Sequence, residues 1–79
     1  MENRTTLDQV KPGQKAEVIA LEGEGGIKNR ITEMGLIRGS KIEVERVAPL
    51  GDPMDIKVRG YRLSLRKEEA SRVMVKLLP

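Results

Sequence analysis

The stretch that decides the fold is 41-KIEVERVAPLGDPMDIKVRGYRLSL-65. In its first part the apolar residues Ile42 and Val44 alternate with charged ones, and the same alternation returns over Met54–Val58. A period of two residues is typical of strands that bury one face. The alternation fails at Arg46, which predicts a β-bulge or a bend there. The stretch therefore predicts consecutive antiparallel strands, the first two joined by a turn at PLGDP.

A second turn in this stretch predicts a hairpin with a defined register. If Gly60-Tyr61 forms a two-residue turn, Val58 lies opposite Leu63 and Ile56 lies opposite Leu65. All four apolar side chains then point to the same face of the hairpin, as a buried face requires.

Strands are also predicted on both sides of this stretch. Lys15–Leu21 alternates, with Ala16, Val18 and Ala20 expected on one face. Before it, Pro12-Gly13 suits a type II turn that follows a short helical turn. After the hairpin, KEEAS at 67–71 predicts one helical turn and 73–77 predicts the last strand.

One helix is predicted between the first two strands. Ile27, Ile31 and Met34 recur at the spacing of a single helix face, which predicts a helix over Ile27–Met34. Gly35 suits its end, because the residue after a helix often adopts the left-handed conformation that glycine takes without steric cost.

These elements predict an all-β fold: a small five-stranded SH3-like barrel with one short helix between strands 1 and 2 and a helical turn before the last strand. Residues 1–79 form one domain, with a core from roughly 5 to 78. Phe, Trp and Cys are absent and Tyr61 is the one aromatic residue, so the core must consist of aliphatic side chains and Met. Closure of a barrel would also remove exposed strand edges.

The composition argues against catalysis. The chain has no His and no Cys, and no spacing of Ser, Lys, Tyr or carboxylates suggests an acid–base pair. The formal net charge of +3 suits solubility and dictates no partner. We therefore expect a protein that binds another molecule, rather than an enzyme.

The lack of a recognisable targeting signal favours a cytoplasmic location. Residues 1–9 are polar and charged, unlike a signal peptide, and no apolar run approaches the about 20 residues of a membrane span. The lack of cysteine agrees with a reducing compartment. We expect a cytoplasmic protein without membrane insertion.

No cofactor is predicted, and metal binding is weakly suggested at most. Ferrous iron and zinc generally bind imidazole or thiolate, which this chain lacks. Glu22 and Glu24 could form a weak site of oxygen ligands only. The glycine-rich loop 23-GEGG-26 precedes the predicted helix, but the two glutamates would repel a phosphate, so we interpret it as a flexible loop.

Two surfaces are candidates for a partner. Apolar residues at Leu36, Ile37 and Leu50 would mark a protein interface if they cluster on the surface. A basic patch of Arg59, Arg62, Arg66 and Lys67, with Lys57 beside Arg59, is the alternative, and small barrels do bind nucleic acids through such patches. Nucleic acid is disfavoured, because no aromatic platform is available for base stacking and glutamates on the neighbouring strand would neutralise half of the patch.

Three segments together carry a family resemblance: TLDQVKPGQKAEV at 6–18, RITEMGLIRGSKIEV at 30–44 and IKVRGYRLSLRKEEASRVMV at 56–75. The chain resembles the FeoA family, ferrous iron transport protein A of bacteria, from Leu7 to Leu78. Similar barrels are appended to iron- and manganese-dependent repressors, but without a helix-turn-helix ahead of the barrel we expect a free-standing member.

The resemblance implies a function. It implies an SH3-like barrel that assists ferrous iron uptake by contacting the cytoplasmic part of the membrane transporter FeoB. Because His and Cys are missing, we interpret the protein as an adaptor that modulates the transporter rather than as an iron carrier. A basic nucleic-acid-binding barrel, a regulatory domain that weakly binds a transition metal ion, and a weak homo-oligomer stay open as alternatives.

Overall fold

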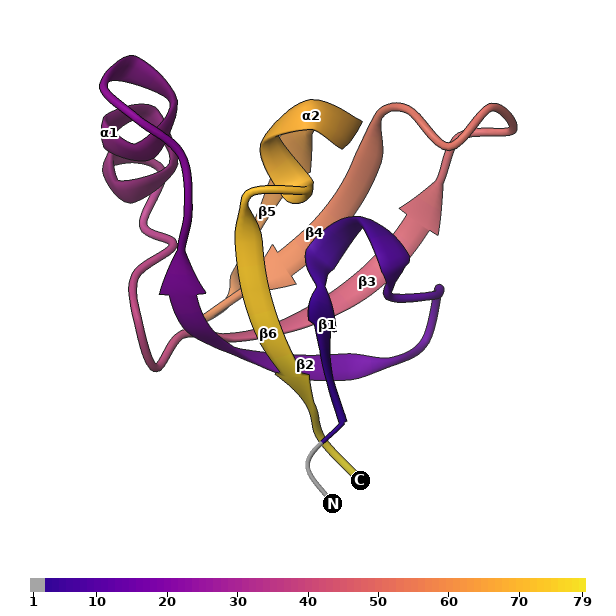
Figure 1. The fold of residues 1–79 in the computed structure, drawn as a ribbon. Helices are drawn as coiled ribbons and strands as arrows, with labels where there is room; N and C mark the ends of the chain where they lie inside the picture. The colour runs from indigo at the N-terminus through magenta and orange to yellow at the C-terminus, as the bar shows by residue number, and fades with distance from the viewer. Residues whose placement is uncertain (1–2) are drawn as a thin grey trace.

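The protein contains one sheet of six antiparallel strands, seen in a computed structural model that describes residues 3–79. Along the sheet the strand order is β1-β6-β2-β3-β4-β5. The sheet curls strongly, the helical turns α2 and η1 lie at its upper end, and the helix α1 stands at its side (Figure 1). The strands are β1 (Arg4–Thr6), β2 (Lys15–Leu21), β3 (Lys41–Val47), β4 (Met54–Val58), β5 (Tyr61–Leu65) and β6 (Val73–Leu77), and the helices are η1 (Leu7–Gln9), α1 (Gly26–Glu33) and α2 (Lys67–Ala70).

The prediction of a closed five-stranded barrel is wrong in its strand count and in its closure. The additional strand is β1, which pairs with β6 so that Arg4 lies opposite Lys76. Within residues 3–79 the sheet has two edges, β1 and β5, so it is curled but open. The helix α1 accordingly lies between the second and third strands of the chain.

The β-bulge predicted near Arg46 is confirmed, because the pairing of β3 with β4 shifts register between Val44 and Arg46. A second bulge, in β2 between Val18 and Ala20, was not predicted. It reverses the faces of the strand beyond it, so that Ala20 is exposed and Leu21 packs against the core. The prediction that Ala20 shares a face with Ala16 and Val18 is therefore wrong.

The register predicted for the β4–β5 hairpin is also wrong. Val58 lies opposite Tyr61, and Ile56 lies opposite Leu63. The turn consists of Arg59 and Gly60, whose φ angles of 44° and 88° are both positive, as a two-residue type I′ turn requires. Because the shift is by two residues, the side chains keep their faces and Ile56 still points inward.

The carboxyl end of α1 forms a Schellman motif. The amide of Gly35 donates to the carbonyl of Thr32 at 2.9 Å, and the amide of Leu36 donates to the carbonyl of Ile31 at 3.3 Å. Gly35 has a φ of 96°, which a side chain would disfavour. The motif turns the chain sharply and brings Leu36 back into the core beside Ile31.

The core is aliphatic and lies inside the curl of the sheet. Strands β2 to β6 contribute alternate residues, while η1, α1 and α2 each supply at least one side chain. Packing of this kind is the main source of stability in a small domain without disulfides. The buried apolar residues are Leu7, Val10, Ala16, Val18, Ile31, Leu36, Ile42, Val44, Met54, Ile56, Val58, Leu65, Ala70, Val73 and Val75.

Candidate functional site

The three apolar residues predicted to mark a partner surface do not form one patch. Leu36 is fully buried, because the Schellman motif folds it into the core, so its prediction as a surface residue is wrong. Ile37 is 46% exposed and Leu50 is 93% exposed. They lie beyond opposite ends of the seven-residue strand β3, which at about 3.3 Å per residue spans about 20 Å. Ile37 and Leu50 therefore do not form one contiguous apolar patch.

Ile37 sits at the start of a turn that is held firmly in place. The amide of Ser40 donates to the carbonyl of Ile37 at 3.0 Å, and the amide of Ile37 donates to Ser40 Oγ at 3.1 Å. Ser40 is fully buried and also donates to the carbonyl of Gly35 at 3.3 Å. The amide of Gly39 anchors the same turn to strand β2 through the carbonyl of Val18 at 2.7 Å. An apolar side chain presented in this way loses little conformational entropy when a partner binds.

The residues of the predicted basic patch are spread along strand β5. Arg59 lies in the turn before β5, whereas Arg66 and Lys67 follow its far end. Between them, Arg62 Nε of β5 forms an ion pair of 2.9 Å with Glu45 Oε1 of β3, across the intervening strand β4. The neutralisation expected from the glutamates of the adjacent strand concerned Lys57 and Arg59, and among residues 3–79 the ion pair of Glu45 is with Arg62 instead. The four residues thus do not form one continuous positive surface.

Positive charge gathers instead in a shallow recess that sequence reasoning missed. The recess has a volume of about 210 Å³ and opens at the ends of β2, β3 and β4. We call it the basic recess; its cations are Lys15, Lys41, Lys57 and Arg59. Of these, Arg59 belonged to the predicted patch and Lys57 was expected beside it, whereas Lys15 and Lys41 were not predicted. The sequence pattern could not predict this cluster, because Lys15 lies near the other cations only through the pairing of β2 with β3.

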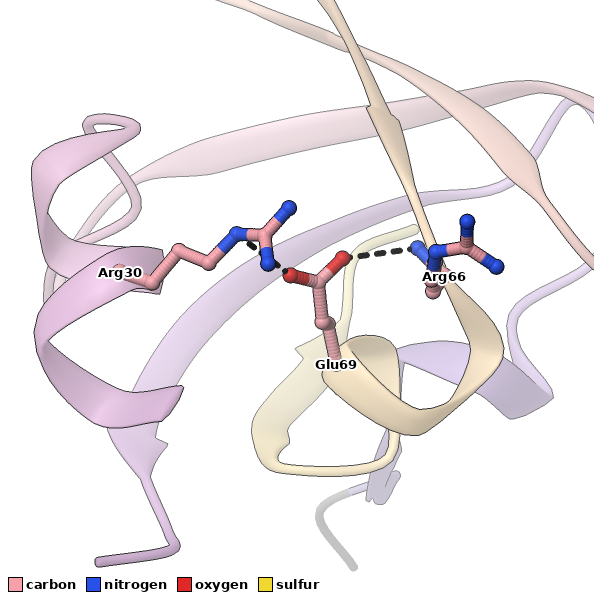
Figure 2. A network of polar contacts seen from close by, with 3 residues as sticks. All are labelled: Arg30, Arg66 and Glu69. Carbon is pink, nitrogen blue, oxygen red and sulfur yellow. Dashed lines mark hydrogen bonds and ion pairs between the residues drawn. The ribbon is translucent and has the colours of Figure 1, made fainter. Parts of the chain in front are cut away.

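A buried carboxylate links the two helices. Glu69 is 7% exposed, and its Oε2 lies 3.1 Å from Arg30 Nε of α1. Its Oε1 accepts a 3.0 Å hydrogen bond from the amide of Arg66, at the start of α2 (Figure 2). Figure 2 shows this carboxylate between the two arginines, with the Arg66 side chain turned away from it. The arrangement satisfies a free amide at the helix start and compensates the buried charge, so we interpret it as structural.

The two glutamates considered for metal binding both lie exposed in the loop between β2 and α1. The amide of Glu22 donates to the carbonyl of Arg72 at 2.7 Å, which ties the start of this loop to the segment before β6. Among residues 3–79, no three carboxylates gather in a group that could hold a metal ion. In the same part of the chain, no helix is long and apolar enough to cross a membrane.

The curled antiparallel sheet with its two short helices places the protein in the class of small SH3-like β domains. Within this class the chain belongs to the FeoA domain family, which it matches over residues 5–77.

Solved structures of this family share the fold. A FeoA-like protein of Clostridium acetobutylicum is 39% identical with a TM-score of 0.91, over 100% of this chain and 92% of that one. FeoA of Stenotrophomonas maltophilia, described as an SH3 domain protein and solved in complex with zinc, is 28% identical with a TM-score of 0.78, over 90% of this chain and 88% of that one.

A curated relative combines this domain with a transporter. It is the Fe(2+) transport protein A/Fe(2+) transporter FeoB fusion protein of Porphyromonas gingivalis, 38% identical over 72 residues. The match covers 91% of this chain but only 8% of the fusion protein. The chain therefore corresponds to one small domain of that much longer polypeptide.

Proposed function

We propose that the protein is a non-enzymatic accessory factor of ferrous iron uptake, which binds the cytoplasmic part of the transporter FeoB and modulates it. The observation that supports this most is the relative from Porphyromonas gingivalis, in which a FeoA protein and FeoB form one polypeptide. Membership of the FeoA domain family over residues 5–77 agrees with it.

A fusion supports association for a physical reason. When two domains share one chain, a contact between them becomes intramolecular and the effective concentration reaches about millimolar. A contact that would be weak between separate molecules is then formed most of the time. Such a contact needs an exposed docking residue, and Ile37 on its anchored turn meets this requirement.

Modulation then follows from differential binding. If the protein binds one conformation of the transporter more tightly than another, it shifts the equilibrium between them by the difference in binding free energy. This mechanism needs no iron ligand on the protein, and the chain offers neither imidazole nor thiolate. The role is that of an adaptor rather than of a carrier.

The proposal is tested by an NMR titration of ¹⁵N-labelled protein with the cytoplasmic domain of the transporter from the same organism, with and without guanine nucleotide. We expect chemical shift changes centred on Ile37 and the turn that follows it. No change at about 1 mM of the transporter domain, a concentration that detects very weak binding, would refute the proposal.

A further inference from the structure

We propose that the basic recess is a binding site for an acidic peptide segment that carries one apolar side chain between its carboxylates. Ile37 does not line this recess, and the proposal does not depend on the identity of the partner proposed above.

The recess concentrates unpaired positive charge. None of Lys15, Lys41, Lys57 and Arg59 forms an ion pair with a carboxylate of residues 3–79, whereas Arg30, Arg46 and Arg62 all do. One acid, Glu43, lies among them, since it stands opposite Lys15 on one side and Lys57 on the other. A second acid, Glu17 of β2, stands opposite Lys41. Four cations against these two carboxylates leave a local excess of positive charge, which attracts an anionic ligand.

The recess has one apolar side chain whose position is fixed. This is the half-buried Leu78, whereas Ile42, which also lines the recess, is only 3% exposed and belongs to the core. The amide of Leu78 donates to the carbonyl of Lys15 at 2.9 Å, which ties the end of the chain to the start of β2. A volume of about 210 Å³ is below the about 300–1,000 Å³ of sites for whole small molecules, so the recess suits one side chain.

The same geometry favours a peptide over a membrane or a nucleic acid. The apolar surface of the recess is a single half-buried side chain, Leu78, whereas binding to a membrane surface uses a broad apolar face. Proteins that bind single-stranded nucleic acids commonly stack bases on aromatic side chains, but no aromatic residue lines the recess, and the hydroxyl of Tyr61 is bonded to the carbonyl of Met34. Glu43 within the rim also repels a phosphate placed centrally, while separate carboxylates on either side of an apolar residue can avoid it.

The test uses the full chain and three capped pentapeptides: Glu-Asp-Leu-Asp-Glu, Glu-Asp-Gly-Asp-Glu and the uncharged Gln-Asn-Leu-Asn-Gln. Binding is followed by ¹⁵N NMR at about 20 mM and about 150 mM salt, since screening changes over this range. We expect the first peptide to shift amides around the recess with a Kd below about 1 mM at low salt. The glycine peptide should bind at least about threefold more weakly, and the uncharged peptide should not bind.

Variants of matched charge locate the site. The double variant Lys57→Gln/Arg59→Gln should weaken binding by at least about threefold, while Glu43→Gln should strengthen it. Lys28→Gln/Lys67→Gln removes the same charge from α1 and α2 and should leave binding within about twofold. The amide spectrum of each variant reports whether it is folded.

Four outcomes would overturn the proposal. The first is that the acidic peptide causes no chemical shift changes, and the second is that the control variant loses as much binding as the recess variant, which would mean diffuse attraction by net charge. The third is that phosphatidylglycerol vesicles or a single-stranded oligonucleotide bind through the recess while the peptide does not. The fourth is that recess amides shift with protein concentration in the absence of peptide, which would make a second copy of this chain the occupant.

Discussion

The hydroxyl of Tyr61 donates a 2.9 Å hydrogen bond to the main-chain carbonyl of Met34, and so joins edge strand β5 to the carboxyl end of α1. The last carbonyls of a helix have no partner within the helix, so this bond satisfies one that would otherwise face solvent. Together with the ion pair between Arg30 and Glu69, it fixes α1 beside the sheet at two points. The turn that presents Ile37 follows α1 directly, so both contacts stabilise the proposed docking surface.

Replacing Tyr61 by Phe removes this bond and little else. Because the contact is solvent-exposed, we expect Tyr61→Phe to lower the free energy of unfolding by about 0.5–1.5 kcal/mol, toward the lower end of that range. Urea denaturation measures the loss, and hydrogen exchange should show faster exchange of the amides of Gly35 and Leu36. Unchanged exchange at both amides would show that the bond does not hold the end of α1.

A substitution at Gly35 should cost more than one at Gly13, although the two glycines have similar φ angles of 96° and 89°. A Cβ at Gly35 would overlap the Tyr61 hydroxyl, whereas a Cβ at Gly13 meets no atom within 4 Å. Gly13→Ala therefore reports backbone strain alone, about 1–2 kcal/mol. Gly35→Ala adds the steric term, and thermal or urea unfolding measures the difference.

The steric term can be separated by a double-mutant cycle. In a Tyr61→Phe background the overlapping oxygen is gone, so Gly35→Ala should cost less there than in the unmodified protein. Equal costs in both backgrounds would contradict the assigned contact.

Residue patterns correctly predicted the features that are determined by residues close to each other in the chain. The alternation around Ile42 and Val44 and its failure at Arg46 were enough to predict a strand with a bulge. The turn at Pro12-Gly13 was also predicted correctly, since the amide of Gln14 donates to the carbonyl of Lys11 and Gly13 has a positive φ. In each case the determining residues lie within a few positions of each other.

The predictions that failed concern features that depend on pairing between strands distant in the chain or on an unfavourable backbone conformation. Strand β1 is three polar and charged residues long and forms through its pairing with β6 at the other end of the chain. The hairpin register was missed because Arg59 adopts a positive φ, which a non-glycine residue rarely does. The basic recess was missed for the first of these reasons, because Lys15 joins Lys41 and Lys57 only when β2 pairs with β3 and β3 pairs with β4.

The carboxylate of Glu69 should matter more through its hydrogen bond than through its ion pair. Arg30 is 66% exposed, so Arg30→Gln should cost only about 0.2–1 kcal/mol. Glu69→Gln keeps an oxygen for the amide of Arg66 and should cost slightly more, while Glu69→Ala leaves that amide without its partner and should cost about 1–3 kcal/mol. Urea denaturation ranks the three variants, and a larger loss for Arg30→Gln than for Glu69→Ala would reverse the interpretation.

The proposed docking of the transporter should depend on Ile37 and little on arginines. Ile37→Glu places a charge in an apolar contact and should weaken binding of the transporter's cytoplasmic domain by at least about tenfold. Because the side chain is already 46% exposed, the fold should survive, and a circular-dichroism melt of the variant checks this. Arg62→Ala/Arg66→Ala should cost little, since rim charges mainly tune the association rate. The salt dependence of binding should accordingly be shallow.

Leu50→Glu is the matched comparison, because it introduces the same charge at a 93% exposed position beyond the other end of β3. We expect it to leave binding nearly unchanged; a loss equal to that of Ile37→Glu would extend the interface along the whole strand. If folded Ile37→Glu protein still binds while the arginine double variant does not, docking through an apolar contact is wrong and a charged surface binds the transporter. Binding of the acidic peptide tests the basic recess independently of the transporter. Ile37→Glu should leave peptide binding within about twofold, whereas Lys57→Gln/Arg59→Gln should weaken it more than that.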